Sequence, residues 1–419
     1  MKKASEDILF SDDDQFLITR GINRLYDILS KESGVYAKDL TRDKGLDTSN
    51  GWVVSPAHAA HCIKDWARTT RFLRGIYQAI KHCLTDGKQV QILYAGCGPY
   101  ATLCTPLTTQ FTPEEISFTL LDINEISLKA VEKVYTKQNL LAYVDCFLLA
   151  DATDPEIEFG KRFDIIISET MQAGLKREHQ VLLTRNLIGF LKDEGTFIPQ
   201  KITLDLFMEN SLGNCIDKTG DRLYLGTAYE LDYKSVPEAN DSTSFVIPET
   251  DLQYLKLYTT IQVFEDEKLI AGQSGLTQPL TLDRFITSSL HKINFTYMEG
   301  PKPGLTFDYE SYSNGQEVFS STEQGTIPIY HLKRYWSKII AELNGQKRKI
   351  SQNEHAVDQA LLDTLGVGLY PALQYLYGYS PTFEEFESWI QAHTDLESRK
   401  DTIAQFNSLF EEKNDAPGH

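Results

Sequence analysis

The chain has 419 residues, 41% hydrophobic and 24% charged, which is enough to bury the cores of about two or three domains and excludes a disordered chain. Its formal net charge of −18 opposes non-specific attraction to nucleic acid and suits a cationic substrate, although solvated surface acids give the same charge without any function. Its apolar runs are far shorter than the roughly 20 residues that cross a bilayer, and acids follow the N-terminal lysines, so we expect a cytoplasmic protein with no membrane contact and no secretion signal.

In the first half of the chain, apolar residues recur first at helical spacing and then in short buried runs. The helical spacing predicts an amphipathic helix over 14–30 and a second helix over 56–84. Beyond these, predicted strands over 90–95, 116–121 and 163–168 alternate with predicted helices over 124–138 and 178–191. This alternation is typical of an α/β fold with a parallel, doubly wound, Rossmann-like sheet.

After Pro199 the pattern changes to half-buried strands separated by Gly and Asn. Such strands are predicted over 202–207, 258–264, 291–298, 305–309 and 327–330, which indicates a mostly antiparallel β-domain. The segment Cys215–Asp251 is rich in Gly, Asp, Asn, Ser and Pro, so we predict that it is an excursion from this domain. Helical stretches are expected over 353–377 and 382–410.

The first predicted strand leads directly into a glycine turn at Gly96 and Gly98. Glycines permit a sharp turn and let the backbone approach a nucleotide or an amino-acid group without a clashing Cβ atom. A P-loop would need Gly-Lys-Ser/Thr, and a dinucleotide site usually has a third glycine that opens the helix. Neither is present here, so a cofactor without phosphates fits this turn better.

Two aspartates stand at the ends of predicted strands. Asp122 ends the second strand, where nucleotide-binding α/β folds place an acid on the ribose hydroxyls, and Asp151 ends the next, where an acid can reach the adenine amino group. Both have a plainer interpretation. Asp122 can cap the helix that follows it, and Asp151 begins the turn-forming sequence Asp-Ala-Thr-Asp-Pro.

A second pair of acids, Glu169 and Glu178, brackets a glycine-containing loop after the strand that ends at Ser168. The loop can fold back and bring both carboxylates together, and two carboxylates repel unless a cation lies between them. A guanidinium group suits that place, because its planar fork pairs with carboxylates and stays charged at neutral pH. Carboxylates that draw its charge toward some nitrogens leave the lone pair of another nitrogen for a sulfonium methyl group. Taken singly, each glutamate could be an ordinary charge at a strand end or a helix start.

At these residues the sequence resembles the protein arginine methyltransferase family. The family's loop, Ser-Glu-x-Met followed by Leu and Glu, matches Ser168, Glu169, Met171, Leu175 and Glu178. The stretch 190–204 is similar to the family's path from its sheet into a β-barrel, and 63–69 resembles its Lys-Asp-x-x-Arg-Thr helix. The resemblance is specific over 60–204 and architectural from there to about 344.

The resemblance implies a class I methyltransferase sheet followed by a β-barrel-like domain, with extra N- and C-terminal helices. It implies S-adenosylmethionine as the cofactor and Arg68 as the residue that binds the cofactor's carboxylate. Glu169 and Glu178 would be catalytic and, with Met171, would bind the substrate. No metal is needed, since the methyl group passes by direct displacement. The barrel of this family carries a dimerisation arm, for which 215–251 is the candidate, so a homodimer is expected.

These inferences divide the chain into four parts. We expect an N-terminal helical segment over 1–55, a cofactor-binding domain over 56–199, a β-barrel-like substrate domain over 200–345 and a C-terminal helical extension over 346–419.

Three features depart from the family's pattern. The glycine motif has Tyr100 in place of its last glycine, and the residues after Asn344 have no counterpart. The family's Thr-His-Trp loop has no match, because neither His291 nor His331 is followed by Trp.

Arg68 also has a plainer interpretation, since it could pair with Asp65 on the surface of its helix.

The sequence therefore predicts an S-adenosylmethionine-dependent N-methyltransferase that acts on the guanidino group of free arginine, a small guanidine or a protein arginine. One alternative is a small-molecule N- or O-methyltransferase of a biosynthetic pathway. A second is a non-catalytic protein that keeps the fold and binds partners, for example through the aromatic residues of its C-terminal helices. The six cysteines include no Cys-x-x-Cys pair, so we expect reduced thiols and neither a zinc site nor disulfides.

Overall fold

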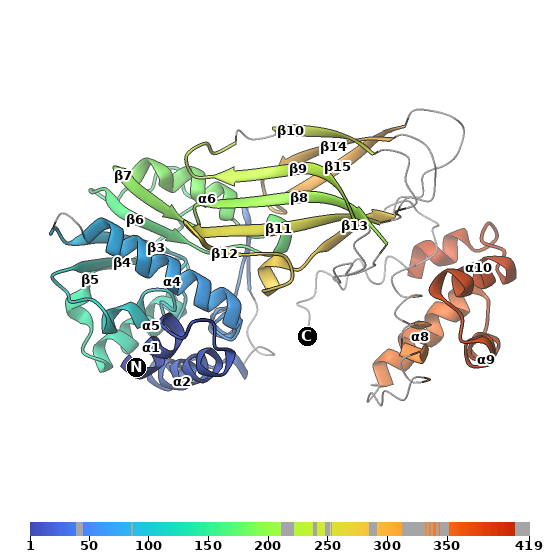
Figure 1. Cartoon of the computed structure of the whole chain (residues 1–419), viewed down its shortest axis with the longest axis horizontal. Coiled ribbons are helices and arrows are strands. Elements are labelled where there is room, and N and C mark those ends of the chain that lie inside the picture. The colour runs from blue at the N-terminus through green and yellow to red at the C-terminus, as the bar shows by residue number, and fades with distance from the viewer. Residues whose placement is uncertain are drawn as a thin grey trace. The chain divides into compact units, whose positions relative to one another are not determined.

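A computed structural model describes residues 1–38, 45–84, 87–210, 222–237, 241–247, 252, 254–284, 291–311, 332, 335–336, 338–340, 343 and 352–406. The chain divides into two compact units (Figure 1). The N-terminal unit comprises 1–282 and 288–314, and the C-terminal unit comprises 283–287 and 315–419.

The N-terminal unit is built on a five-stranded parallel sheet with the order β5-β4-β3-β6-β7. Its strands are β3 (Val90–Ala95), β4 (Ile116–Asp122), β5 (Val144–Leu149), β6 (Phe163–Ser168) and β7 (Leu191–Ile198). The helices α4 (Trp66–Cys83), α5 (Glu125–Lys137) and α6 (Gln180–Leu187) pack against it. The predicted α/β, Rossmann-like sheet is thus confirmed. The strand order reverses at β3, and in such sheets ligands bind beyond the carboxyl ends of the strands at that point.

Helices precede the sheet, and side-chain caps define where they begin. The helix α1 (Lys2–Leu9) was not anticipated, whereas α2 (Gln15–Ser33) begins as predicted, where the Asp14 carboxylate accepts from the backbone N–H groups of residues 16 and 17. The helix predicted over 56–84 is two helices, α3 (Pro56–Cys62) and α4. Asp65 caps the N-terminus of α4, with its carboxylate oxygen 3.2 Å from the amide nitrogen of Arg68. Because α4 begins directly after Asp65, Arg68 lies in the first turn of this helix.

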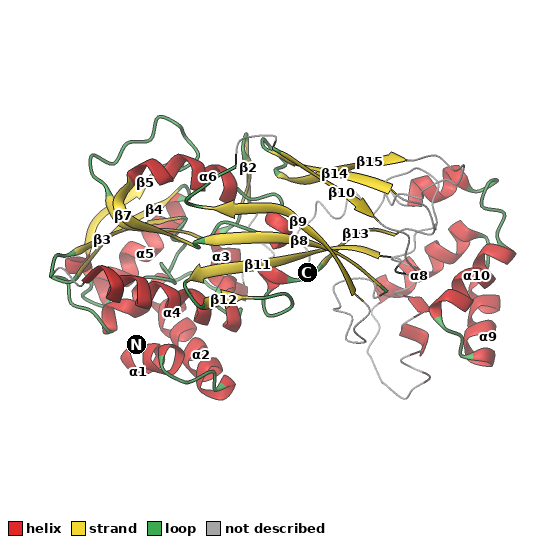
Figure 2. Cartoon of the chain, turned by 45° about the horizontal axis from the view of Figure 1, so that its top comes forward, coloured by secondary structure: helices red, strands yellow, loops and turns green. Residues whose placement is uncertain are grey.

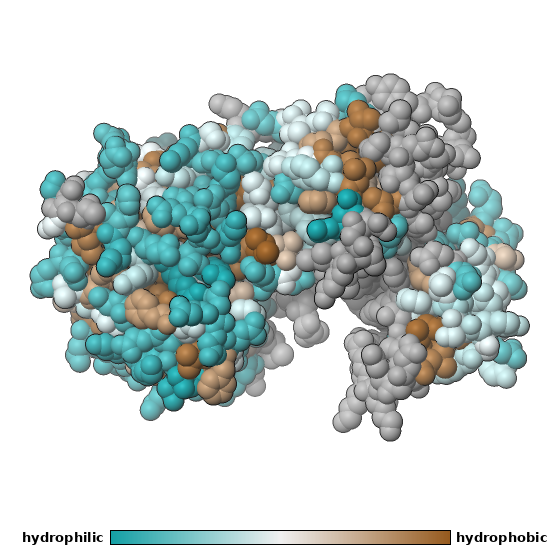
Figure 3. All heavy atoms as spheres, in the orientation of Figure 1, coloured by the Kyte–Doolittle hydropathy of each residue, from teal (hydrophilic) through white to brown (hydrophobic). Residues whose placement is uncertain are grey.

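A short hairpin lies between α2 and α3, in the part of the chain where only a helical segment was expected. It consists of β1 (Leu46–Thr48) and β2 (Gly51–Val53). Figure 3 shows that the face of the molecule over α1, α2, α4 and the parallel sheet is mainly hydrophilic. Within the described residues, none of the helices combines the length and the apolar composition needed to span a membrane.

Two antiparallel sheets follow the parallel sheet (Figures 1 and 2). The first, with the order β12-β11-β8-β9, contains β8 (Lys201–Glu209), β9 (Arg222–Asp232), β11 (Tyr254–Phe264) and β12 (Glu267–Leu269), and β13 (Leu280–Arg284) also pairs with β11. The second, with the order β10-β14-β15, contains β10 (Ser242–Ile247), β14 (His291–Met298) and β15 (Gly304–Ser311). The predicted β-barrel-like domain is thus confirmed as a pair of antiparallel sheets. The strand predicted over 327–330 lies outside the described residues.

The segment 215–251, which we predicted to be an excursion, contributes two strands to these sheets. β9 pairs with β8 from Arg222 to Asp232, and β10 pairs with β14 from Ser242 to Ile247. Those residues are therefore parts of the β-domain itself. A role of the segment in dimerisation stays a prediction.

The C-terminal unit is helical. Its helices are α8 (Gln352–Leu365), α9 (Leu369–Tyr379) and α10 (Phe383–His393), and residues 400–406 are helical as well. The helix predicted over 353–377 is interrupted at Gly366 and Gly368, which have positive φ angles of 71° and 34°. Leu332, Tyr335 and Ile339 pack into the core of these helices, so the helical extension begins before residue 346.

Candidate functional site

A pocket lies at the carboxyl ends of the parallel strands of the N-terminal unit. It is formed by the β1–β2 hairpin, the helices α3 and α4, the turns after β3, β4 and β5, and the loop after β6. Its volume, including the part open to solvent, is about 1100 Å³, enough for a small organic molecule. All the residues that the sequence singled out line it: Arg68, Gly96, Gly98, Asp122, Asp151, Glu169, Met171 and Glu178.

The glycine turn forms one wall of this pocket. Gly96 and Gly98 have φ angles of +75° and +64°, in the left-handed region that favours glycine. The amide nitrogens of Gly96 and Cys97 lie 2.9 and 3.0 Å from the carbonyl oxygen of Leu121, which ties the turn to the end of β4. A Cβ atom on Gly96 would lie only 2.7 Å from the side chain of Thr170, so the turn also packs tightly against the loop after β6.

Asp122 stands beside the turn with both carboxylate oxygens fixed. The backbone N–H groups of Gly98 and Asn124 each donate to one of them, with N···O distances of 2.8 Å. Burial raises the pKa of Asp122 to about 6, against these two hydrogen bonds, which lower it. The predicted alternative for Asp122, capping the next helix, is wrong, because Asn124 caps α5.

Asp151 organises the turn after β5. One of its oxygens accepts hydrogen bonds from the backbone N–H and the hydroxyl of Thr153, at 2.8 and 2.7 Å. The same hydroxyl accepts from the side-chain amide of Asn50 in the hairpin, at 2.8 Å. Asp151 thus performs its plainer, turn-forming role, and contact with a cofactor stays a prediction.

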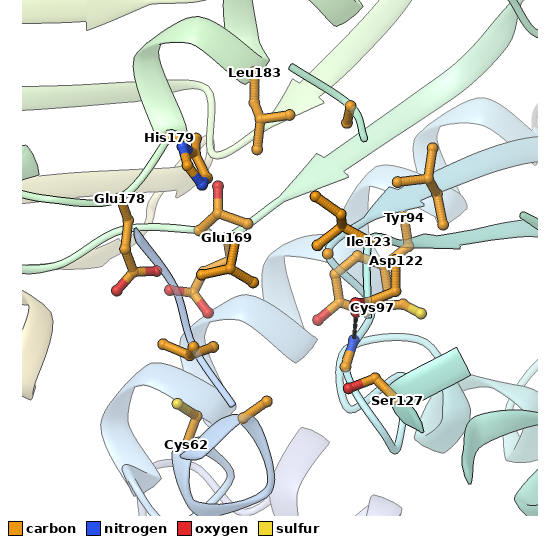
Figure 4. A pocket seen from close by; sticks show the side chains of 18 of the residues that line it. Cys62, Tyr94, Cys97, Asp122, Ile123, Ser127, Glu169, Glu178, His179 and Leu183 are labelled. Atoms are coloured by element: carbon orange, nitrogen blue, oxygen red, sulfur yellow. Dashed lines mark hydrogen bonds between the residues drawn. The ribbon is translucent and has the colours of Figure 1, made fainter. Parts of the chain in front are cut away.

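The two glutamates converge on the opposite wall. Figure 4 shows the carboxylates of Glu169 and Glu178 pointing toward one another from the loop after β6, and each residue is only 8% exposed. One oxygen of Glu169 pairs with the guanidinium of Arg68. The other is buried and has no hydrogen-bond partner among the described residues. Burial raises the pKa of Glu178 to about 7, although Arg68, Gln172 and Arg177 act to lower it.

Arg68 therefore lies with the glutamates and reaches the pocket from the first turn of α4. The alternative pairing with Asp65 is not what the structure has. One oxygen of Asp65 caps α4, and the other accepts from the Ser274 hydroxyl at 2.7 Å and the Gly275 backbone N–H at 2.8 Å. The Arg68 guanidinium thus pairs with Glu169, while only the Arg68 backbone N–H donates to Asp65, and the predicted bond of Arg68 to a cofactor carboxylate stays a prediction.

Sequence reasoning missed the hairpin that covers this wall. The backbone N–H of Trp52 donates to the carbonyl of Arg177 at 2.7 Å, and the Arg177 guanidinium lies 5.5 Å from the centre of the Trp52 ring. The ring nitrogen Nδ1 of His179 lies 3.0 Å from the carbonyl oxygen of Asn50. The sequence Ser49-Asn50-Gly51 was the available signal, since such residues favour tight turns.

His179 is the other functional candidate that the sequence did not reveal. It lines the pocket directly after Glu178, whereas the side chains of His291 and His331, the histidines considered beforehand, lie outside the described residues. Within the part of the chain that the structure describes, no group of His, Cys, Asp or Glu side chains is arranged to hold a metal ion.

No protein-family model matches the sequence, and no curated protein matches it either. Among solved structures, the chain is similar to a PRMT1 enzyme–prozyme heterotetrameric complex of Trypanosoma brucei with AdoHcy, at 14% identity and a TM-score of 0.48, over 62% of this chain and 94% of that one. It is also similar to protein arginine methyltransferase 10 of Arabidopsis thaliana in an open conformation, at 13% identity and a TM-score of 0.45, over 63% of this chain and 95% of that one. Both likenesses concern the fold alone.

Proposed function

We propose that this chain is an S-adenosylmethionine-dependent N-methyltransferase that acts on a guanidino group. The observation that carries the proposal is the pair of buried carboxylates, Glu169 and Glu178, which face one another in the pocket that the glycine turn and Asp122 also line. Two ionised carboxylates in one buried site repel each other strongly unless cations bind between them. Arg68 supplies one cation, and the acceptor would supply the second.

The other wall supports a cofactor without phosphates. At Gly96 the backbone approaches the pocket in a turn that a Cβ atom would disrupt, and the Asp122 carboxylate is fixed by two backbone N–H groups. Ribose hydroxyls would donate to the remaining lone pairs of that carboxylate, and Asp151 would face the adenine. When bound, S-adenosylmethionine supplies a sulfonium-activated methyl group. Arg68 would hold the carboxylate of its methionine part.

The glutamates support a guanidinium acceptor. One oxygen of Glu169 is buried without a hydrogen-bond donor, and such a group costs about 1–3 kcal/mol, more when it is charged. A planar guanidinium can donate to this oxygen and to Glu178 at the same time. The pair would then orient the acceptor, draw its positive charge toward two nitrogens and leave the third nitrogen for the methyl group.

Mass spectrometry of reactions with S-adenosylmethionine and either free L-arginine or an arginine-rich peptide tests the proposal. We expect a 14-Da mass increase on one acceptor, the mass of the CH₂ that N-methylation adds, and its loss in Glu169→Gln. Glu132→Gln, on the exposed side of α5, is the matched control and should stay active.

The outcomes separate the remaining alternatives. Methylation of the peptide alone would indicate a protein substrate, and methylation of L-arginine alone would indicate a metabolite. Cofactor binding without either product would overturn the guanidine assignment in favour of another small-molecule acceptor. Failure to bind the cofactor would overturn the proposal as a whole and favour a non-catalytic binding protein.

A further inference from the structure

The side chain of His179 is a buried imidazole inside the pocket with no role in the site as described so far. Its residue is 8% exposed, lines the pocket and follows Glu178 directly. Figure 4 shows its ring beside Glu169 and Glu178, on the same wall of the pocket. A buried imidazole next to two acids that would bind an acceptor is placed to exchange a proton with that acceptor.

The hairpin fixes which ring nitrogen carries a proton. Nδ1 of His179 lies 3.0 Å from the backbone carbonyl oxygen of Asn50. A carbonyl oxygen only accepts, so Nδ1 must be the donor, and in the neutral ring Nε2 keeps its lone pair. No second hydrogen bond joins the ring to the residues that the structure describes. Nε2 is therefore the nitrogen left to accept a proton.

Gly51 lets the ring take this position. Its φ angle is +142°, and a Cβ atom there would lie 2.6 Å from the carbonyl oxygen of Arg177, 2.8 Å from Nδ1 of His179 and 3.0 Å from Cε1 of His179. The Nδ1 edge of the ring therefore lies directly against the hairpin backbone. A side chain at residue 51 would push the ring away from the carbonyl that orients it.

We infer that Nε2 of His179 is the general base of the methyl transfer, an inference that rests on the proposed function. When the acceptor nitrogen forms its bond to the methyl carbon, the bond from that carbon to sulfur breaks and its electron pair stays on sulfur. The methylated nitrogen then carries one proton more than the same nitrogen does in the product, a methylguanidinium. That proton passes to Nε2 and from there to solvent. A neutral base leaves Glu169 and Glu178 ionised, so both acids keep holding the cationic product.

Several charged or titratable groups line the pocket together with this ring. They are Glu169 and Glu178 of the loop after β6, Arg68 of α4, Cys62 of α3 and Asp151 of the turn after β5, and Arg177 lies beside the hairpin that the ring contacts. The pH dependence of the wild type therefore combines several groups. The comparison of matched variants isolates the contribution of His179.

The first test is His179→Gln, beside His82→Gln on the exposed end of α4 as the matched control. A general base contributes about 10²–10⁴-fold to the rate, so we expect kcat to fall by at least about 100-fold in the first variant and to be unchanged in the second. Binding of S-adenosylhomocysteine should stay within about threefold. The deficit should shrink as the pH rises, because hydroxide then takes over the proton, and a merely structural role would not produce this dependence.

Gly51→Ala tests the position of the ring with the histidine left in place. We expect a similar loss of kcat, since the added Cβ would push the hairpin away from both the His179 ring and the Arg177 carbonyl and so displace Nδ1 from Asn50. Gly34→Ala is the control, because Gly34 has a φ angle of +81° and no atom within 4 Å of an added Cβ. The control also places an alanine at a positive φ angle, without touching the ring.

A nitrogen-15 NMR spectrum of the histidine rings tests the tautomer without any turnover. The proton should reside on Nδ1 of His179, and Nε2 should shift when L-arginine binds together with S-adenosylhomocysteine. A proton on Nε2 of the neutral ring would overturn the inference, and so would full activity of His179→Gln. A wild type that methylates no guanidine would instead refute the proposed function, so the two failures are distinguishable.

Discussion

Single residues decide the electrostatics of this pocket, and Glu178 shows how. Burial raises its pKa from 4.5 to about 7, so the folded protein holds this proton more tightly than the unfolded chain does. The stability that results is present below the unfolded pKa and is lost as the pH rises through the folded one, so ionised Glu178 opposes folding near pH 8. Keeping Glu178 ionised in the pocket therefore lowers the stability of the folded protein.

Replacing Glu178 with Gln should therefore stabilise the unliganded protein in a pH-dependent way. We expect the melting temperature to rise at about pH 8, by an amount equivalent to at most ~3 kcal/mol, and to match that of the wild type near pH 4.5. Thermal unfolding monitored by circular dichroism across this range checks it. An equal gain at both pH values would show that the ionisation of Glu178 is not the cause.

Gly96 determines whether the cofactor wall can form. An alanine there would adopt a φ angle of +75° and place its Cβ atom 2.7 Å from Thr170, and such strain costs on the order of 1–3 kcal/mol. We expect Gly96→Ala to weaken the binding of S-adenosylhomocysteine at least about tenfold in isothermal titration calorimetry. Gly189→Ala, where an added Cβ meets no atom within 4 Å, should bind as the wild type does.

At the scale of elements, the start of α4 connects the parallel sheet with the segment that follows β12 in the N-terminal unit. Asp65 caps this helix and also binds Ser274 and Gly275, which follow β12. Asp65→Ala should lower the free energy of unfolding by about 1–2 kcal/mol through the lost cap alone, and should also weaken cofactor binding because Arg68 lies one turn away.

Asp14→Ala provides the comparison for this variant. Asp14 caps α2 through two backbone N–H groups and lies outside the pocket. Both variants should unfold at lower urea concentration, but only Asp65→Ala should bind S-adenosylhomocysteine more weakly. A loss of cofactor affinity in both would mean that general destabilisation, and not the position of α4, controls the site.

The three parallel strands β3, β4 and β6 were predictable because they are largely buried. β3 and β6 have the bounds expected from the sequence, and every residue of β4 is buried, so continuous apolar runs mark them clearly. β9 was missed because its pairing with β8 shifts register at two places, which removes the regular alternation of buried and exposed residues. The break between α3 and α4 was missed because apolar residues continue through it, and only the cap at Asp65 marks the new start.

The same contrast holds for the site. Gly96, Asp122 and Glu169 were found because each ends or directly follows a strand, where chain order alone brings residues together at one edge of the sheet, and Glu178 was found because it closes the loop that Glu169 opens. The role of His179 could be recognised only from its contact with the hairpin. This contact joins two residues, Asn50 and His179, that lie 129 positions apart in the chain. No local pattern encodes such a contact.

For the whole molecule, the pocket belongs to the N-terminal unit and the C-terminal helices belong to the other unit. All the residues that line the pocket lie between Trp52 and Leu183, and the C-terminal helices have a hydrophobic core of their own. A chain that ends at residue 314 should therefore bind S-adenosylhomocysteine within about threefold of the full chain. Titration calorimetry of the two proteins checks this, and loss of binding on truncation would show that the C-terminal unit supports the pocket.

The buried, unpaired oxygen of Glu169 has a practical consequence for measurements on this protein. A guanidinium ion can donate to that oxygen and to Glu178 together, so guanidinium chloride would be a ligand of the native state at low concentration and a denaturant at high concentration. The free energy of unfolding should first rise and then fall as the concentration of guanidinium chloride increases, whereas in urea it should only fall. A Glu169→Gln variant should lose the initial rise, and free energies extrapolated from the two denaturants should then agree.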